Sequence, residues 1–370
     1  MRIALVSPMY PSPSNPVFGA FIKRQEDALR LLGVQFCHAV DSDYQPGEKT
    51  IQKYGVLARR VAQLRSEQFD LVHVHFPNVT GVFAAMLARY AHTPLIATFH
   101  GGELDPATLQ DMTYAKRVIT RRSAVWTARQ AFASIGVGPE VVQALLHAGI
   151  AQEKVFMWDM GVDCQKCQRI DKEAARHKLG LPAQAQVVVF AGWLTPAKSP
   201  ESVVHAAHIL RDRHPQCHWF LLGSGPLEST LMDLVRSYGL ADRVSLPGRR
   251  SWDEVQEWNA AADVHVMPTL TEAFGLSCLE AMACGTPVVA SAVGGLLSFV
   301  VDNQNGCLIP PGDAEALAAR VSQLLTNPQQ ARALGEQGRK TAQSHDLHVQ
   351  ARKVYDLYTT ALSDGGRSPR

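Results

Sequence analysis

Short apolar segments alternate with longer helical segments along nearly the whole of this 370-residue chain. The apolar segments have the composition of β-strands, and the segments between them are long enough to form helices. Because most of these strands are apolar almost throughout, both faces of each sheet are expected to be covered. The alternation therefore predicts an α/β fold in which helices pack on both sides of parallel sheets.

The pattern occurs twice, which predicts two domains for a chain of this length. The first half has strands predicted at Ile3–Ser7, Val34–Ala39, Leu71–His75, Leu95–His100, Ala131–Ile135 and Val155–Met157. Helices are predicted between them, for example over Phe21–Leu32, Val56–Glu67, Val79–Ala91 and Pro139–Ala148. The second half has strands predicted at Val187–Ala191, Trp219–Gly223, Val244–Leu246, Val264–Met267 and Val288–Ala290. The polar, less regular segment Asp159–Ala185 between the halves is the best candidate for a linker.

The strongest local signal lies in the last third of the chain. A strand that ends at Met267 leads into a loop that holds Glu272, and a helix is predicted over Phe274–Cys284. Gly285 occupies the position just beyond this helix where glycine is favoured. A second strand follows at Val288–Ser291 and completes a strand–helix–strand unit.

This unit is suited to binding a phosphate. The free N–H groups at the start of the helix, near Gly275, and the positive end of its dipole face the loop. Glu280 lies about 80° around the helix and about 12 Å along it from Glu272. Either carboxylate alone is most simply interpreted as an electrostatic cap or a solvent-facing residue. Beside a phosphate site, the two favour a long polyhydroxylated ligand, with one carboxylate on sugar hydroxyls and the other on a ribose diol.

The segment Glu272–Ser291, EAFGLSCLEAMACGTPVVAS, carries two glutamates separated by seven residues and resembles the retaining glycosyltransferases of family 4. The resemblance covers nearly the whole chain and is strong from Val187 to Asp313. It implies the GT-B fold, in which two Rossmann-like domains, each a doubly wound parallel sheet, face each other across a cleft.

The resemblance also implies which ligand each domain binds. The N-terminal domain, residues 1–165, would bind the acceptor, and residues 166–346 would bind a nucleotide-sugar. The last helix, at about 347–362, would pack back onto the first domain. The implied reaction moves a sugar from a UDP- or GDP-sugar to an acceptor hydroxyl with retention of configuration. No cluster of metal ligands stands at a predicted strand end, so neither a metal ion nor another cofactor is expected, and the nucleotide-sugar is a co-substrate.

The family motif assigns roles around the donor. In the family, the first glutamate contacts the donor sugar, the amides that follow it bind the diphosphate, and the second glutamate binds the ribose. The glycine turn after the second strand of this domain shapes the nucleotide pocket. The corresponding residues here are Glu272, the backbone of Ala273, Phe274, Gly275 and Leu276, then Glu280, and Gly223 in the turn.

One position departs from the family pattern. Family members have an arginine and, five residues later, a lysine, and these two cations clamp the diphosphate. Lys198 is present here, but Trp193 stands at the arginine position. Another cation such as Arg249 or Arg250 would supply the charge, or Lys198 and helix N-termini would suffice, or the enzyme would be slow or inactive. The Trp193 ring is also suited to stacking on an acceptor or a sugar.

The N-terminal half supplies the remaining candidates. Gly19 precedes the first predicted helix, where the family has a glycine loop that meets the donor diphosphate and the acceptor. His100, at the end of a predicted strand, matches the family histidine that reaches the donor sugar. The catalytic residues are therefore predicted to be His100, Glu272 and Lys198. Residues predicted on the acceptor side are Lys23, Arg24, His75 and Glu103.

Charge limits the partners of the chain. The net charge is only +2, which argues against general nucleic-acid binding. Residues 1–180 carry 21 Lys and Arg against 16 Asp and Glu, whereas residues 181–370 carry 15 against 18. A basic N-terminal domain suits a peripheral contact with an anionic membrane or a phosphorylated acceptor, although solvated helix faces explain it equally well. The acceptor itself, a lipid-linked glycan, a polysaccharide or a small metabolite, is not determined by the sequence.

Composition predicts a cytoplasmic protein, with the inner face of the plasma membrane as the place of any membrane contact. No apolar run approaches the ~20 residues of a membrane span, and the start of the chain is too short before Pro8 for a signal peptide. The seven cysteines are scattered, which suits a reducing compartment. Cys164 and Cys167 form a C-x-x-C pair, but no second pair stands at metal-site spacing.

Two other functions fit the same residues. A nucleotide-sugar epimerase of this fold would act on the donor alone. A non-catalytic homologue would bind nucleotide without turnover, and Trp193 leaves this alternative open.

Overall fold

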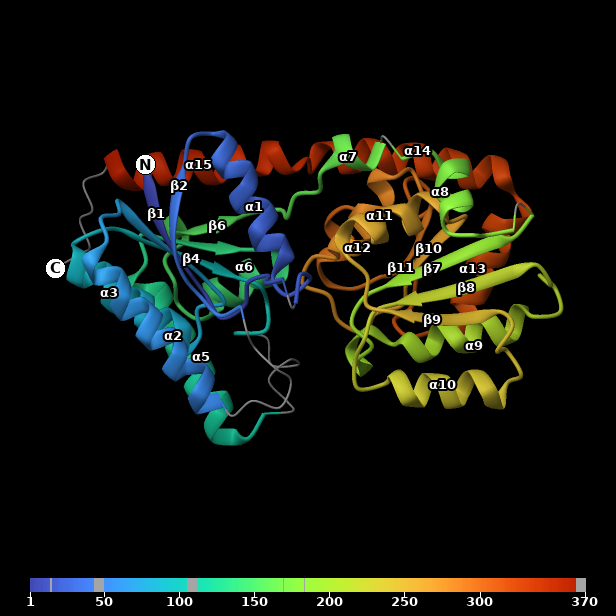
Figure 1. The fold of residues 1–370 in the computed structure, drawn as a ribbon, viewed down its shortest axis with the longest axis horizontal. Coiled ribbons are helices and arrows are strands. Elements are labelled where there is room, and N and C mark those ends of the chain that lie inside the picture. Colours follow the sequence, from blue (N-terminus) through green and yellow to red (C-terminus); the bar gives the residue numbers. More distant parts are fainter. Residues whose placement is uncertain (14, 43–49, 105–111, 169, 183, 364–370) are drawn as a thin grey trace. The chain divides into compact units, whose positions relative to one another are not determined.

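The computed structural model describes the chain apart from residues 14, 43–49, 105–111, 169, 183 and 364–370, and the side chains of 50–53. It forms two compact units (Figure 1). The first contains Met1–Met160 and the C-terminal segment from His348, and the second contains Gly161–Leu347. The sequence placed the first division at residue 165. Each unit has its own sheet and its own core.

The described part of the first unit holds a six-stranded parallel sheet with the strand order β2-β1-β3-β4-β5-β6. The strands are β1 (Arg2–Ser7), β2 (Gln35–Val40), β3 (Leu71–His75), β4 (Leu95–Phe99), β5 (Ala133–Gly136) and β6 (Val155–Met157). The helices are α1 (Ala20–Leu31), α2 (Thr50–Gln63), α3 (Val79–Ala91), α5 (Tyr114–Gln130), α6 (Pro139–His147) and α15 (Leu347–Ser363). Short 3₁₀ turns lie at η1 (Leu64–Ser66) and η2 (Gln152–Lys154).

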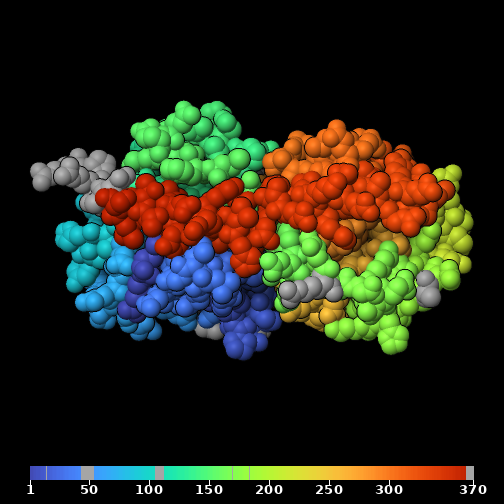
Figure 2. Space-filling model, turned by 90° about the horizontal axis from the view of Figure 1, so that it is seen from above, coloured from blue at the N-terminus to red at the C-terminus, as the bar shows by residue number. Residues whose placement is uncertain are grey.

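Successive residues of a strand point to opposite faces of the sheet. Because both faces of this sheet carry apolar side chains, helices cover both of them. Val72 and Val74 of β3 join the core formed with α2, α3 and α5. His73 and His75 point to the opposite face, where the hydroxyl of Tyr358 on α15 lies 2.6 Å from Nδ1 of His73. In Figure 2 helix α15, coloured red, lies on the surface of this unit beside its blue N-terminal segment.

The described part of the second unit holds another six-stranded parallel sheet, ordered β12-β11-β10-β7-β8-β9. The strands are β7 (Gln186–Ala191), β8 (Cys217–Leu222), β9 (Val244–Gly248), β10 (Val264–Met267), β11 (Val288–Ser291) and β12 (Cys307–Ile309). The helices are α7 (Cys164–Gln168), α8 (Lys172–Lys178), α9 (Pro200–Leu210), α10 (Glu228–Ser237), α11 (Trp252–Ala261), α12 (Leu276–Ala283), α13 (Ala314–Thr326) and α14 (Pro328–Ser344). The 3₁₀ turns are η3 (Pro196–Lys198) and η4 (Gly294–Ser298).

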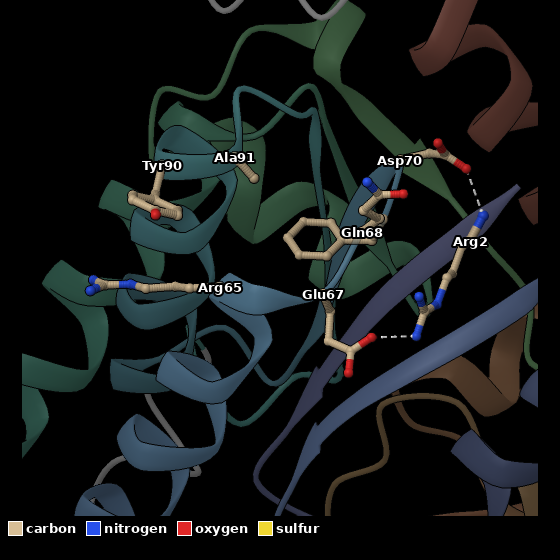
Figure 3. A pocket seen from close by; sticks show the side chains of 8 residues that line it. Arg2, Arg65, Glu67, Gln68, Asp70, Tyr90 and Ala91 are labelled. Atoms are coloured by element: carbon tan, nitrogen blue, oxygen red, sulfur yellow. Dashed lines mark hydrogen bonds and ion pairs between the residues drawn. The ribbon is translucent and has the colours of Figure 1, made fainter.

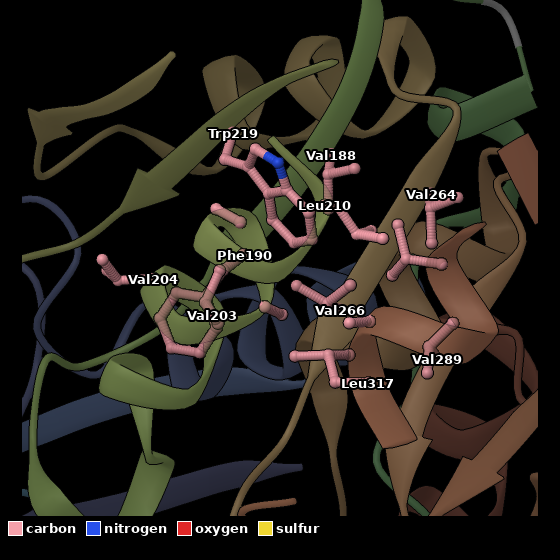
Figure 4. Packing of buried hydrophobic residues seen from close by; sticks show 14 of the residues in the cluster. Val188, Phe190, Val203, Val204, Leu210, Trp219, Val264, Val266, Val289 and Leu317 are labelled. Atoms are coloured by element: carbon pink, nitrogen blue, oxygen red, sulfur yellow. The ribbon is translucent and has the colours of Figure 1, made fainter. Parts of the chain in front are cut away.

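The larger core of this unit lies between the sheet and helices α9, α10 and α13 (Figure 4). Trp219 of β8 and Phe190 of β7 are its largest members, and both are fully buried. A smaller core on the other face packs Val187 and Val189 of β7 against Trp258 of α11. Alternate side chains of β7 therefore pack into two different cores, which explains why the strand is apolar at nearly every position.

The structure differs from the sequence prediction in three places. The proposed linker Asp159–Ala185 contains helices α7 and α8, and the buried thiols of Cys164 and Cys167 pack α7 onto the second unit. Strand β12, Cys307–Ile309, was not predicted, because three residues are too few for a clear strand signal. Helix α12 begins at Leu276, two residues later than predicted.

Each sheet has a switch point, where neighbouring strands send the chain in opposite directions. It lies between β1 and β3 in the first unit and between β7 and β10 in the second. Ligands of doubly wound sheets bind outside the carboxyl ends of the strands at such points. Most of the predicted site residues follow these strands or their neighbours.

Candidate active site

In the second unit, Lys198 and Glu272 stand on two loops that meet at the switch point. Lys198 ends η3 after β7, and Glu272 lies in the loop after β10. Their side chains form an ion pair in which Lys198 is 25% and Glu272 11% exposed. Thr269 ties the loops together, since its hydroxyl donates a hydrogen bond to the carbonyl of Ala197 at 2.8 Å. The structure thus brings two of the three predicted catalytic residues together.

Helix α12 begins beside this pair without a side-chain cap, so its first N–H groups and its positive end are available to an anion. The sequence placed Gly275 near the start of this helix, and the structure shows why a glycine stands there. Gly275 has a φ of 101°, and a Cβ there would lie 2.5 Å from Cδ2 of Leu296 in η4. The glycine is required because η4 packs directly against it.

The residues between Glu272 and α12 are held from behind by η4. Phe274 is buried and packs on Phe299, with ring centroids 5.3 Å apart. The N–H of Gly295 donates to the carbonyl of Glu272 at 3.0 Å, and a Cβ at Gly295 would lie 2.2 Å from the carbonyl oxygen of Ala273. The backbone of this segment is therefore fixed, whereas the side chain of Phe274 serves as an anchor and faces the interior.

Glu280 is buried, at 6% exposure, so it is not the solvent-facing residue of the simpler interpretation. Its Oε1 accepts a hydrogen bond from Nε1 of Trp252 at 2.6 Å. Trp252 is the first residue of α11, directly after Ser251, which forms a capping box with Glu254. Sequence reasoning missed Trp252, although the capping-box spacing places it at a helix start. The tryptophan orients the carboxylate.

Trp193 is 49% exposed, and the guanidinium of Arg249 lies over its ring, 5.1 Å from the centroid. Nη2 of Arg249 donates to the hydroxyl of Ser224 at 3.2 Å. Ser224 follows Gly223, where a Cβ would lie 1.9 Å from the carbonyl oxygen of Gly192. The glycine at position 223 therefore lets the loops after β7 and β8 touch. The structure places a cation on the residue that stands where the family has arginine.

In the first unit, the ends of β3 and β4 bring two histidines together. Nδ1 of His75 lies 3.0 Å from Nε2 of His100. The ring of Phe76 stacks on His100 with centroids 4.2 Å apart, and Phe21 of α1 lies 5.1 Å away. Burial lowers the pKa of His100 to about 3 and that of His75 well below its ordinary value. Both imidazoles are therefore neutral near pH 7 and act as hydrogen-bonding groups without charge.

Glu103 supports the loop that carries His100. Its carboxylate is 2% exposed, and each oxygen accepts a hydrogen bond from the backbone N–H of His100 at 3.2 Å. Burial raises the pKa of Glu103 to about 7, although backbone hydrogen bonds oppose this rise. The carboxyl group folds the loop and points inward.

Gly19 precedes α1 with a φ of 73°, and a Cβ there would lie 2.9 Å from the backbone of Met9. The loop after β1 therefore folds tightly against the start of α1. On α1, Lys23 forms an ion pair with Asp27 one turn further on. Arg24 on the same helix is half-buried. The structure does not bring Lys23 to the histidine pair.

Glu26 is a residue that the sequence reasoning missed. This buried carboxylate accepts hydrogen bonds from Tyr10, from Arg30 at 2.7 Å and, at 2.9 Å, contacts Nε2 of His38. Burial alone would raise its pKa, but these contacts outweigh burial and lower the pKa to about 2. The network ties the loop after β1 to α1 and β2. Its only sequence signal is the spacing of Glu26 and Arg30 on one helix face.

A hollow of about 610 Å³ lies at the opposite, amino-terminal edge of the first sheet (Figure 3). Its charges are already paired. The backbone N–H of Arg2 donates to Asp70 at 2.7 Å, and its guanidinium lies 2.6 Å from Glu67. The guanidinium of Arg65 lies over the ring of Tyr90. The hollow contains none of the predicted site residues.

The described residues contain no group of three or more His, Cys, Asp or Glu side chains that could hold a metal ion. They also contain no helix that is long and apolar enough to cross a membrane.

Comparison with known proteins identifies the family. Residues 171–341 match the model of glycosyl transferases group 1, and residues 17–166 match that of glycosyltransferase family 4. A D-inositol 3-phosphate glycosyltransferase of Thermobispora bispora is 30% identical over 334 residues, which are 86% of this chain and 76% of the relative.

Solved structures agree with this result. Sucrose-phosphate synthase from Thermosynechococcus elongatus is 26% identical, with a TM-score of 0.83 over 99% of this chain and 100% of its own. Anabaena HepE, solved in complex with UDP-glucose, is 21% identical and has the same fold, with a TM-score of 0.80 over 97% of this chain and 100% of its own.

The chain belongs to glycosyltransferase family 4 and has the GT-B fold, as its sequence predicted. It is a glycosyltransferase.

Proposed function

We propose that this protein transfers a sugar from a UDP- or GDP-sugar to an acceptor hydroxyl with retention of the anomeric configuration. The observation that supports this best is the Lys198–Glu272 pair beside the uncapped start of α12. In the proposal, Glu272 accepts hydrogen bonds from hydroxyls of the donor sugar. Lys198 and the N–H groups around Gly275 bind the diphosphate, and Glu280, oriented by Trp252, binds the ribose diol.

The proposed chemistry needs no protein nucleophile. The oxygen of the acceptor hydroxyl forms a bond to the anomeric carbon as the bond to the diphosphate breaks, and the leaving phosphate takes the hydroxyl proton on the same face of the sugar. Lys198 and the positive end of α12 stabilise the charge that develops on the leaving group. His100 hydrogen-bonds a sugar hydroxyl as a neutral imidazole. Gly19 allows the start of α1 to approach the diphosphate.

The proposed reaction uses no metal ion, because a lysine and a helix end supply the positive charge. Turnover is therefore expected to be the same with excess EDTA as with added magnesium. Loss of turnover in EDTA and its recovery with magnesium would overturn this part of the proposal.

UDP is the first nucleotide to test, since HepE of the same fold was solved with UDP-glucose. A thermal-shift screen with UDP, GDP, ADP and dTDP sugars measures binding directly, because a ligand that binds only the folded state raises its stability. Selective stabilisation by UDP or GDP compounds is expected. Equal shifts with all four, or none, would contradict the proposed donor class.

The acceptor panel follows from the relatives and from charge. D-inositol 3-phosphate belongs in it because the name of the Thermobispora relative contains it. Lipid-linked glycans and polysaccharide fragments complete the panel. Lys23 and Arg24 remain proposed acceptor-side residues, whereas the buried carboxylate of Glu103, also predicted on the acceptor side, is proposed to hold the loop of His100 in place. Product identified by mass spectrometry, with the anomeric configuration determined by NMR, tests both transfer and retention.

Helix α5 supports a peripheral contact with an anionic membrane, proposed here at the inner face of the plasma membrane. Its exposed apolar side chains include Trp126 and Ile119. The helix contains no acidic residue, and its five cations are Lys116, Arg117, Arg121, Arg122 and Arg129. Such a surface is attracted to anionic lipid. Flotation with phosphatidylserine vesicles, but not with phosphatidylcholine vesicles, is expected, and Arg121→Glu/Arg122→Glu should abolish it. Equal flotation of the variant would refute the contact.

The two alternative functions give different results in one assay. An epimerase changes the donor when no acceptor is present, and a non-catalytic homologue binds nucleotide but consumes no donor. Incubation of a stabilising donor alone, and then with the acceptor panel, therefore separates all three functions.

A further inference from the structure

His100 is held on several sides by residues at the end of β3, just after it and on α1. His75 contacts its Nε2, Phe76 stacks on its ring, and Phe21 packs against it at a tilted angle. Phe76 has a φ of 54°, a left-handed conformation that is rare for a bulky residue. With this strained backbone, the side chains of His75, the last residue of β3, and of Phe76, directly after it, both contact the same imidazole. Strain of this kind is retained where the surrounding structure requires the conformation.

The contact between the two histidines links their protonation patterns. A neutral imidazole carries one N–H, so a hydrogen bond between two neutral rings has one donor and one acceptor. If Nδ1 of His75 donates the hydrogen bond, Nε2 of His100 accepts it, and His100 must carry its own proton on Nδ1. If Nδ1 of His75 accepts the hydrogen bond, Nε2 of His100 carries the proton, and Nδ1 of His100 is the unprotonated nitrogen. Among the described residues, Nδ1 of His100 has no hydrogen-bond partner. The direction of one hydrogen bond therefore decides whether this nitrogen donates or accepts.

We propose that His75 is a positioning residue that fixes the ring orientation and the tautomer of His100. Nδ1 of His100 is then presented to a hydroxyl of the donor sugar in a single state. His75 was predicted on the acceptor side, but its side chain is 1% exposed, and it acts through His100 without touching the ligand. This inference rests on the proposed function, because it assigns the ligand of His100.

Three variants separate hydrogen bonding from packing. His75→Asn places an amide near the position of Nδ1 and can donate or accept, whereas His75→Phe keeps an aromatic ring without a nitrogen. His73→Phe is the matched control. His73 is equally buried on the same strand face but contacts Thr98 and Tyr358 and makes no hydrogen bond to His100. Circular dichroism and thermal unfolding establish that each variant folds, and His75→Leu replaces His75→Phe if the latter does not.

The tautomer is measured directly by two-bond ¹H–¹⁵N correlation spectra of protein labelled with ¹⁵N-histidine, with His100 assigned through a His100→Asn variant. One tautomer of His100 is expected in the wild type, in His75→Asn and in His73→Phe. A mixture of tautomers is expected in His75→Phe or His75→Leu. A mixture in the wild type, or a single unchanged tautomer without the His75 nitrogen, would overturn the inference.

Kinetics supply the second readout. His75→Phe is expected to lower kcat on the order of 100-fold, the scale of a misplaced catalytic group, with little change in the KM for the donor. His75→Asn should recover most of this loss. Equal kcat in the Asn and Phe variants would contradict the inference. If the wild type transfers no sugar, the proposed function fails, and the spectra still test whether His75 sets the tautomer of His100.

Discussion

The two units place their candidate residues at equivalent points of similar sheets, but they use opposite kinds of groups. The second unit presents a lysine, a carboxylate and the positive end of a helix, all near the solvent. The first presents neutral, buried imidazoles between aromatic rings. The lysine and the helix end suit a diphosphate, whereas the carboxylate and the neutral imidazoles suit sugar hydroxyls. The chemistry of each site therefore depends on burial more than on strand topology.

The largest expected effect tests the charged side of this comparison. Glu272→Gln keeps the shape of the side chain but removes the charge that pairs with Lys198. We expect kcat/KM to fall on the order of 1000-fold, as when a preorganised polar group of an active site is removed. Affinity for UDP, measured by calorimetry, should stay the same or increase, since Lys198 is released from its partner.

Glu254→Gln on α11 is the matched control, because Glu254 is an exposed carboxylate of the same unit that caps a helix. It should leave kcat/KM close to that of the wild type. Transfer by Glu272→Gln at the wild-type rate would show that the ion pair is structural.

The second effect tests the neutral, buried side. The pKa of Glu103 is about 7 in the folded protein and near 4.5 when unfolded, so the folded state holds its proton more tightly. The tighter binding of this proton stabilises the folded state. Its contribution to the free energy of unfolding is fully present below pH 4.5 and is lost as the pH rises to 7. The loss is up to about 3 kcal/mol, at about 1.4 kcal/mol per pKa unit.

Buried His73 and His100 give the opposite slope, because their lowered pKa values add stability as the pH rises toward 6.5. The wild type and Glu103→Gln share this contribution of the histidines, so it cancels in the difference between their free energies of unfolding. The stability of the variant relative to the wild type should increase between pH 4.5 and 7 in urea titrations. A constant difference across this range would mean that Glu103 is charged in its buried position.

The third effect concerns the cation on Trp193. If Arg249 supplies charge to the diphosphate, Arg249→Ala should weaken UDP binding about 10-fold and leave uridine binding unchanged, in line with the loss of one charge-assisted hydrogen bond. The double variant Trp193→Arg/Arg249→Ala should restore UDP affinity. Arg250→Ala is the control, since Arg250 faces Glu254. Equal losses for UDP and uridine would place Arg249 at the base, away from the diphosphate.

The smallest effect concerns Trp252. Trp252→Phe removes the hydrogen bond to Glu280 but keeps an aromatic ring, and such a bond contributes about 1 kcal/mol, or about fivefold in affinity. The UDP-induced thermal shift should therefore decrease, and it should decrease further in Glu280→Ala. Unchanged shifts in both variants would exclude Glu280 as the ribose ligand.

Much of the fold could be predicted because strand and helix periods are local properties of the sequence. Predicted and observed bounds of β3, β6, β10 and α3 agree residue for residue, and most of the other predicted elements differ at their ends. The prediction failed where the local signal was short or mixed. Helices α7 and α8 have few residues and a polar composition, so tertiary packing stabilises them more than their own sequence does.

The candidate site likewise has features that the sequence predicted and features that only the tertiary structure shows. The sequence alone determined the α/β class, the order of the strands along the chain and the placement of Lys198, Glu272 and His100 at or just after strand ends, because each follows from neighbours along the chain. Only the tertiary structure decided that Lys198 meets Glu272, that Trp252 holds Glu280, and that His75 contacts His100. These partners lie between 25 and 74 positions apart in the sequence. Burial also set the charge of the histidines, since desolvation depends on the surrounding fold and cannot be read from a residue type.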